Sequence, residues 1–163
     1  MIFGITEAGD ASRDYSWTEK VNDTDMSVII TKHITDEFIE KVLLFKNKVV
    51  IHATCTGYGG TVLEPNVPDY KVQLDAVKKL IKSGFPASQI VVRIDPIIPT
   101  AKGLKTLRKS CLTFITMLRD SVSVLSIITN MYSSGLLRMD CLFCSVVIFL
   151  HQTKNLLWLI MYY

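Results

Sequence analysis

The sequence predicts an α/β fold in which four βα units build a parallel sheet, either half of a (β/α) barrel or an open doubly wound sheet. Short runs rich in Val and Ile recur along residues 1–105, and helix-type patterns with capping residues lie between them. Polar residues follow each run directly, as they do at the carboxyl ends of parallel strands. Alternating strands and helices imply right-handed crossovers between parallel strands. The dinucleotide-binding version of the doubly wound sheet has no support, because no GxGxxG motif follows the first run.

Four apolar runs are the expected strands, at residues 2–6, 27–31, 49–54 and 90–94. The last three show no sustained alternation of polar and apolar residues. That pattern is typical of strands covered on both faces. A whole barrel needs about 200–250 residues, so four units make half of one.

Two helices are expected between these strands, each with its own start signal. Thr35 can cap a helix whose first turn carries two acidic residues. Asp69 can cap a second helix, and Gly84 stands at the end of that helix. We expect a weaker helix within residues 11–21 and a further one after Lys102.

The chain divides into two parts of different composition. It has 163 residues and a net charge of +3, which gives no reason to expect a nucleic-acid partner. Residues 1–109 contain 28 charged side chains, residues 110–163 contain five, and no Glu or Pro occurs beyond residue 99. We therefore expect residues 1–105 to form the α/β part and residues 106–163 to form an irregular, apolar, helical tail.

Charged residues follow three of the four predicted strands. Glu7 follows the first strand, Lys32 follows the second, and Arg93 and Asp95 close the fourth. Arg93 is a candidate anchor for a carboxylate or phosphate group of a small ligand. A structural ion pair is the alternative, either with Asp95, which lies two residues from Arg93 on the same face of the strand, or with Glu7 or Glu64 from the neighbouring loops. Lys32 is either a solvated lysine or, if buried, a Schiff-base lysine.

A glycine-rich stretch, Gly57–Gly60, follows the third strand. Such a stretch lets the backbone approach a ligand and expose amide N–H groups, or it is a turn that needs positive φ angles. Two neighbouring residues have chemistry of their own. Cys55 is expected as a small core residue rather than a nucleophile, and His52 as a core histidine rather than a base. The residues alone assign no catalytic group.

The motif residues resemble a known family. The stretch Thr54-Cys55-Thr56-Gly57-Tyr58-Gly59, then Glu64-Pro65-Asn66, then Arg93-Ile94-Asp95-Pro96, resembles the uncharacterised radical-SAM-like family catalogued as domain of unknown function 1848, which is distantly similar to spore photoproduct lyase. The resemblance covers residues 1–105 and implies a (β/α) barrel with a cofactor pocket at its strand ends. For the full-length family it implies S-adenosylmethionine and an iron–sulfur cluster. The matching pocket positions are Gly57, Tyr58, Gly59, Glu64, Asn66, Arg93 and Asp95, and Glu7 and Lys32 are further candidates.

The chain departs from this family after about Lys105. Cys141 and Cys144 supply two thiols, and Cys111 lies thirty residues away. An iron–sulfur cluster needs at least three suitably placed cysteines, and a structural zinc site usually needs four ligands. We therefore expect neither a metal nor a cofactor in this chain.

A change of reading frame explains the composition of the tail. Codons for residues 120–132 can be chosen so that the frame two nucleotides later encodes Phe-Arg-Ile-Ser-Val-Ile-Asp-Tyr-Asn-Glu-Tyr-Val, which resembles the next strand of the family. The same shift allows a helix from Lys109 onward. This predicts a one-base insertion or deletion in the codons for residues 106–109.

Two functions follow from these observations. The first is a truncated member of the radical-SAM-like family that is inactive alone. The second is a small non-catalytic domain that binds an anionic ligand at its strand ends, with the tail as a contact to a partner or membrane.

Because no secretory signal precedes the first strand, we expect a cytoplasmic location. The apolar runs at 142–150 and 156–163 are each shorter than the about 20 residues of a membrane span. We instead expect self-association or aggregation through the apolar surface that a half-barrel exposes.

Overall fold

The structure, a computed structural model, describes residues 2–6, 9–98, 100–118, 144–149 and 159–162. Six strands form one sheet in the order β1-β2-β3-β4-β5-β6. Strands β1 to β4 pair in parallel with their neighbours, whereas β5 pairs antiparallel with β4 and β6 antiparallel with β5. The α/β class predicted from the sequence is therefore confirmed. The strands are β1 (Phe3–Ile5), β2 (Met26–Thr31), β3 (Val49–Thr54), β4 (Ile90–Ile97), β5 (Cys144–Phe149) and β6 (Leu159–Tyr162).

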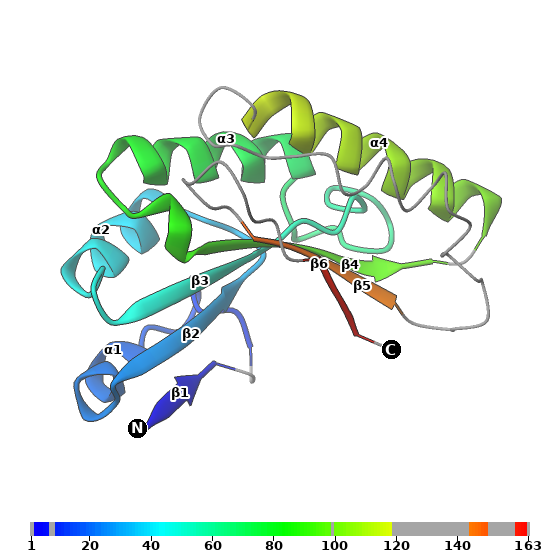
Figure 1. The fold of residues 1–163 in the computed structure, drawn as a ribbon. Helices are drawn as coiled ribbons and strands as arrows, with labels where there is room; N and C mark the ends of the chain where they lie inside the picture. Colours follow the sequence, from blue (N-terminus) through cyan, green and yellow to red (C-terminus); the bar gives the residue numbers. More distant parts are fainter. Residues whose placement is uncertain (1, 7–8, 99, 119–143, 150–158, 163) are drawn as a thin grey trace.

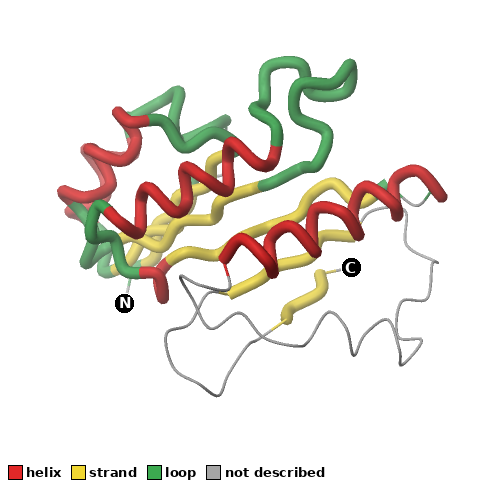
Figure 2. The backbone as a smooth tube through the Cα atoms, turned by 90° about the horizontal axis from the view of Figure 1, so that it is seen from above, coloured by secondary structure: helices red, strands yellow, loops and turns green. Residues whose placement is uncertain are grey.

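The helices cover one face of the sheet. Figure 1 shows the three longer helices on the same side of the strands, and Figure 2 shows them lying over the sheet when it is seen from above. The short α1 belongs to the same layer, because the ring of its Trp17 lies 6.4 Å from that of Phe38 and 6.0 Å from that of Phe45. The helices are α1 (Trp17–Lys20), α2 (Asp36–Leu44), α3 (Tyr70–Lys82) and α4 (Ala101–Leu118), with 3-10 turns at Val21–Asp23 and Ala87–Gln89.

The core lies between the helices and the covered face of the sheet. The strand registers align Ile29 with Ile51 and Ile51 with Ile90, and all three side chains are fully buried. From the helices, Phe38 and Leu74 reach the same layer and are also fully buried. Each such side chain stabilises the fold by about 1.5–3 kcal/mol relative to its exposed state.

The opposite face of the sheet is only partly buried. Burial alternates along β2, where Val28 and Ile30 are half-exposed between buried neighbours, and along β3, where Val50 and His52 are half-exposed. The sequence-based expectation that the strands are covered on both faces is therefore wrong for β2 and β3. Both faces carry apolar residues, but among the described elements the helices pack on one of them.

The predicted helix starts are confirmed. The side-chain oxygen of Thr35 accepts a hydrogen bond from the Phe38 amide at 3.1 Å, and that of Asp69 accepts one from the Lys71 amide at 2.9 Å. These oxygens satisfy amides that have no partner within the helix. Of the weak helix expected within residues 11–21, one turn forms as α1.

The tail contains strands as well as helix. Helix α4 runs without a break across the predicted boundary between residues 105 and 106. The expected helical tail is wrong for β5 and β6, which extend the sheet from the edge of β4. The segment Cys144–Phe149 is rich in β-branched residues, which favour a strand. Within the described residues, no helix is both long and apolar enough to cross a bilayer.

We predict that Thr35→Ala destabilises the protein by about 1 kcal/mol, because the Phe38 amide loses its acceptor. Urea unfolding followed by circular dichroism measures the change. Thr35→Ser keeps the hydroxyl group and should keep most of the stability. An equal loss in both variants would show that the methyl group, and not the cap, is what matters.

Candidate functional site

The carboxyl ends of the parallel strands carry the candidate site, as the sequence predicts for this class of fold. The described residues form two groups there. One group lies in the loops that follow β1, β2 and β3 and centres on Lys32 and Glu64. The other lies on the partly open face of β3 and β4 and centres on His52 and Arg93.

Lys32 and Glu64 form an ion pair between the loop after β2 and the loop after β3. The Lys32 Nζ atom lies 2.6 Å from Oε1 of Glu64, and the two side chains are 41% and 15% exposed. The other carboxylate oxygen of Glu64 is buried and has no hydrogen-bond partner among the described residues. Its exposure agrees with the expected solvated lysine and not with a buried Schiff-base lysine, whereas the ion pair with Glu64 was not predicted.

Asp10, which is not among the predicted site residues, fixes the backbone beside the Lys32–Glu64 ion pair. One of its carboxylate oxygens accepts hydrogen bonds from the Thr31 hydroxyl group and from the amide and hydroxyl groups of Ser12, and the other accepts from the Lys32 amide. Burial alone would raise the pKa of Asp10, but these hydrogen bonds outweigh it and hold the pKa below its ordinary value of 3.8. The Asp-x-Ser spacing is a signal for such a turn, whereas the contact with Thr31 spans 21 residues.

The glycines serve the geometry of the loop itself. Gly57 and Gly60 have φ angles of +71° and +72°, which L side chains rarely adopt. A Cβ atom on Gly59 would lie 1.9 Å from the carbonyl oxygen of Pro68, so that position has room for glycine alone. The Gly60 amide donates to the carbonyl groups of Glu64 and Val67 at 3.0 and 2.8 Å. The positive-φ turn predicted as one alternative is therefore present, and the Gly60 amide is used within the loop.

Two further motif residues anchor the rim of the site. The Tyr58 side chain is half-buried, and this burial raises the pKa of its hydroxyl group above the usual value of 10, against a hydrogen bond with the backbone of Ile98. The carbonyl oxygen of Asn66 accepts a hydrogen bond from the Arg13 guanidinium group at 3.2 Å. Each contact joins the loop after β3 to a segment that follows another strand.

His52 and Arg93 share the partly open face. The strand register pairs Thr54 with Arg93 and His52 with Val91, so the imidazole and guanidinium groups lie on one face of neighbouring strands. Burial, and then the positive charge of Arg93, lower the pKa of His52 to about 4. His52 is therefore neutral at pH 7.

Arg93 has interactions of its own within the structure. The predicted ion pair between Arg93 and Asp95 lies outside the described side chains, and Glu7 lies outside the described residues. The structure thus joins Lys32 to Glu64 and places Arg93 near His52. The roles of Glu7 and Asp95 in the site stay predictions.

The thiol of Cys55 is unsuited to catalysis. Its side chain is 1% exposed, and burial raises the pKa of the thiol far above the ordinary range. Within the described part of the chain, no three His, Cys, Asp or Glu side chains gather as a metal site. The side chains of Cys111, Cys141 and Cys144 lie outside the described ones, so the expectation of no metal and no cofactor in this chain stays a prediction.

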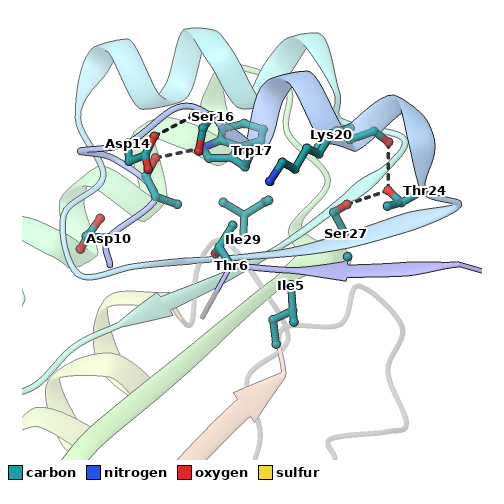
Figure 3. A pocket seen from close by; sticks show the side chains of 13 residues that line it. Ile5, Thr6, Asp10, Asp14, Ser16, Trp17, Lys20, Thr24, Ser27 and Ile29 are labelled. Atoms are coloured by element: carbon teal, nitrogen blue, oxygen red, sulfur yellow. Dashed lines mark hydrogen bonds between the residues drawn. The ribbon is translucent and has the colours of Figure 1, made fainter. Parts of the chain in front are cut away.

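A pocket of about 310 Å³ is lined by none of Lys32, Glu64, His52 and Arg93. It is on the helix side of β1 and β2, where the Trp17 and Lys20 side chains face Ile29 and Thr6 (Figure 3). Its polar lining consists of hydroxyl and charged groups, among them Asp14 and Ser16 from the segment between these two strands and Ser27 from β2. No local sequence signal predicts this pocket, because the pocket depends on how the segment folds over the sheet.

We predict that the imidazole of His52 titrates with a pKa of about 4 and that Arg93→Gln raises this value only in part. Burial is the larger cause and persists in the variant. Because the pKa is depressed on folding, the unfolded state binds more protons between pH 6.5 and pH 4, so the His52 contribution to stability falls as the pH drops through this window. NMR titration measures the pKa, and His52→Gln should remove this part of the pH dependence. A pKa near 6.5 in the wild type would contradict the prediction.

We predict that Gly59→Ala destabilises the protein more than Gly60→Ala. The first substitution forces a clash with the Pro68 backbone, whereas the second meets open space and strains only the φ angle. The second should cost about 1–2 kcal/mol. Thermal unfolding of both variants measures the difference, and equal losses would contradict the close approach.

Comparisons with protein-family models, with curated proteins and with solved structures find no match to this chain. Any assignment of function therefore depends on the motif residues and on the geometry described above.

Proposed function

We propose that residues 1–105 are the N-terminal half of a (β/α) barrel of the radical-SAM-like family described above, and that this chain is a truncated member without that family's chemistry. The observation that carries the proposal is the strand order. β1 to β4 are parallel and lie beside one another in chain order, with the helices on one face. A doubly wound sheet reverses its strand order at a switch point and places helices on both faces, whereas a barrel keeps one direction throughout.

The activity that remains in such a half-barrel is the binding of a small anion at the strand ends. Arg93 supplies positive charge there, and neutral His52 lies on the same face as Arg93, whereas the charge of Lys32 is paired with Glu64. The guanidinium group of arginine binds carboxylate and phosphate groups with two parallel hydrogen bonds. Binding rather than catalysis is favoured because the thiol of Cys55 is buried and protonated.

The same proposal assigns residues 109–163 to translation in a shifted frame. Their sparse charge and their lack of Glu and Pro then have no functional cause. Helix α4 and strands β5 and β6 do not conflict with this, because apolar and β-branched segments form secondary structure wherever they can pair or pack.

The nucleotide sequence of the gene tests the proposed change of reading frame. We expect a one-base insertion or deletion in the codons for residues 106–109, after which the restored frame encodes a helix and then a strand with Arg, Ser and Asp as given above. Sequencing of the genomic locus and of the transcript makes the measurement. A restored frame that runs into stop codons before this strand would overturn the assignment.

Titration with inorganic phosphate tests the anion site. We expect weak, saturable binding to the full chain and an upward shift in the pKa of His52 as the anion offsets the charge of Arg93. Arg93→Ala should weaken binding by about tenfold, the equivalent of about 1.4 kcal/mol, whereas Arg93→Lys should retain part of it. Lys46→Ala is the matched control, since Lys46 is exposed and precedes β3 at the opposite end of the sheet.

The variants separate a ligand anchor from a structural arginine. If Arg93→Ala and Arg93→Lys both unfold the protein, the arginine is structural and the anion site is rejected. If phosphate binds equally well to the wild type and to folded Arg93→Ala, without a change in the pKa of His52, the site is also rejected.

A further inference from the structure

Strand β1 forms an edge of the sheet. It pairs with β2 along one side and is the first strand in the sheet order, so no described strand lies along its other side. An edge of this kind presents backbone N–H and C=O groups that are able to pair with another chain.

The hydrogen bonds of β1 show which of its groups point outward. The Thr6 amide donates to the Val28 carbonyl at 3.0 Å, and the Ile2 carbonyl accepts from the Asp25 amide at 2.9 Å. Backbone groups of successive residues in a strand point to opposite sides. The N–H and C=O groups of Phe3 and Ile5 therefore point away from β2, toward the unpaired side.

The side chains at this edge are large, apolar and exposed. Ile2 is 62% exposed, Phe3 68% and Ile5 55%. The register of Phe3 with Met26 and of Ile5 with Val28 places both side chains on the partly open face, and Figure 3 shows Ile5 on the side of β1 away from Trp17. No charged residue and no Pro occurs in residues 1–6, although such residues usually protect an edge strand from pairing.

We propose that a second copy of this chain pairs with β1, edge to edge and antiparallel, about a two-fold axis at Gly4. In this register Phe3 lies opposite Ile5 of the second copy, and Ile5 lies opposite its Phe3. The outward groups of these residues then form four backbone hydrogen bonds, two in each pair. A two-fold interface requires one surface to complement itself, and this edge does so in both its hydrogen bonds and its apolar side chains.

The glycine at the axis suits this arrangement. Residues that face each other between hydrogen-bonded pairs have Cα atoms only about 4.5 Å apart. Gly4 faces its own copy at that position and brings no side chain into the contact. On the inner side, a Cβ atom on Gly4 would lie 2.7 Å from the Ser27 hydroxyl oxygen. A Phe3–Ile5 cross-strand pair is of the aromatic and β-branched type that stabilises sheets.

The dimer should be a weak one. A three-residue edge is smaller than the about 800 Å² per partner that a standard interface buries. We therefore expect the monomer at low concentration and the dimer in the range of about 0.1–1 mM. The proposal does not depend on the anion site, and phosphate binding and pairing can fail independently.

Sedimentation equilibrium of the full chain tests the pairing, with Ile5→Pro and Ile5→Lys as the variants. Proline removes an outward N–H group that bonds nothing within the described monomer, and lysine places charge at the edge. Each should weaken dimerisation by at least about tenfold. Val72→Lys is the matched control, because Val72 on α3 is also 55% exposed and lies away from β1. It should leave dimerisation unchanged.

Hydrogen exchange provides a readout that needs no variant. The amides of Phe3 and Ile5 should exchange more slowly at high than at low protein concentration, whereas the Thr6 amide, bonded within the monomer, should change less. A wild-type monomer at about 1 mM would overturn the proposal. So would association that Ile5→Pro and Ile5→Lys leave intact, or Phe3 and Ile5 amides whose exchange is independent of concentration.

Discussion

The direction of the chain between parallel strands is the constraint on which the rest of this structure depends. Each connection from β1 to β4 leads to the adjacent strand, and right-handed crossovers then place every intervening helix on the same face. That face gains a packed core around Ile29, Ile51 and Ile90. The other face stays partly open and carries His52 and Arg93, and there burial of the imidazole, and then the positive charge of Arg93, lower the pKa of His52. The packed core, the partly open face and the candidate site therefore all follow from the order and direction of the parallel strands.

Polar contacts then tie the strand ends into a defined rim. Asp10 receives four hydrogen bonds and fixes the backbone at Lys32, and the Lys32 side chain in turn meets Glu64. Gln73 on α3 accepts from the Ile34 amide at 2.9 Å and joins the helix layer to the same loop. Apart from the two bonds between Asp10 and Ser12, these contacts join different βα units, so the rim holds its shape only when the parallel pairing below it is correct.

Local signals predicted the elements whose stability is local. The caps at Thr35 and Asp69, the strand at 49–54 and the core position of Cys55 could all be predicted, because each depends on residues close in the sequence. The one-sided cover of β2 and β3 could not, since apolar residues on an open interior face look the same as residues under a helix. Asp10 and the Lys32–Glu64 pair also escaped prediction, because their partners lie 21 and 32 residues away. Strands β5 and β6 depend on an available edge at β4, which no local pattern reports.

The loop from Gly57 to Pro68 is closed upon itself by the bridge between Gly59 and Glu64 and by the two acceptors of the Gly60 amide. Compact loops of this type are packed by their own residues rather than by a bound molecule. A ligand that met this rim would find it already ordered, so binding would lose little conformational entropy in the loop. The same preorganisation prevents the loop from adapting to different ligands. Because the backbone at Gly59 lies so close to that of Pro68, the loop has one shape, and a ligand that does not fit this shape is excluded.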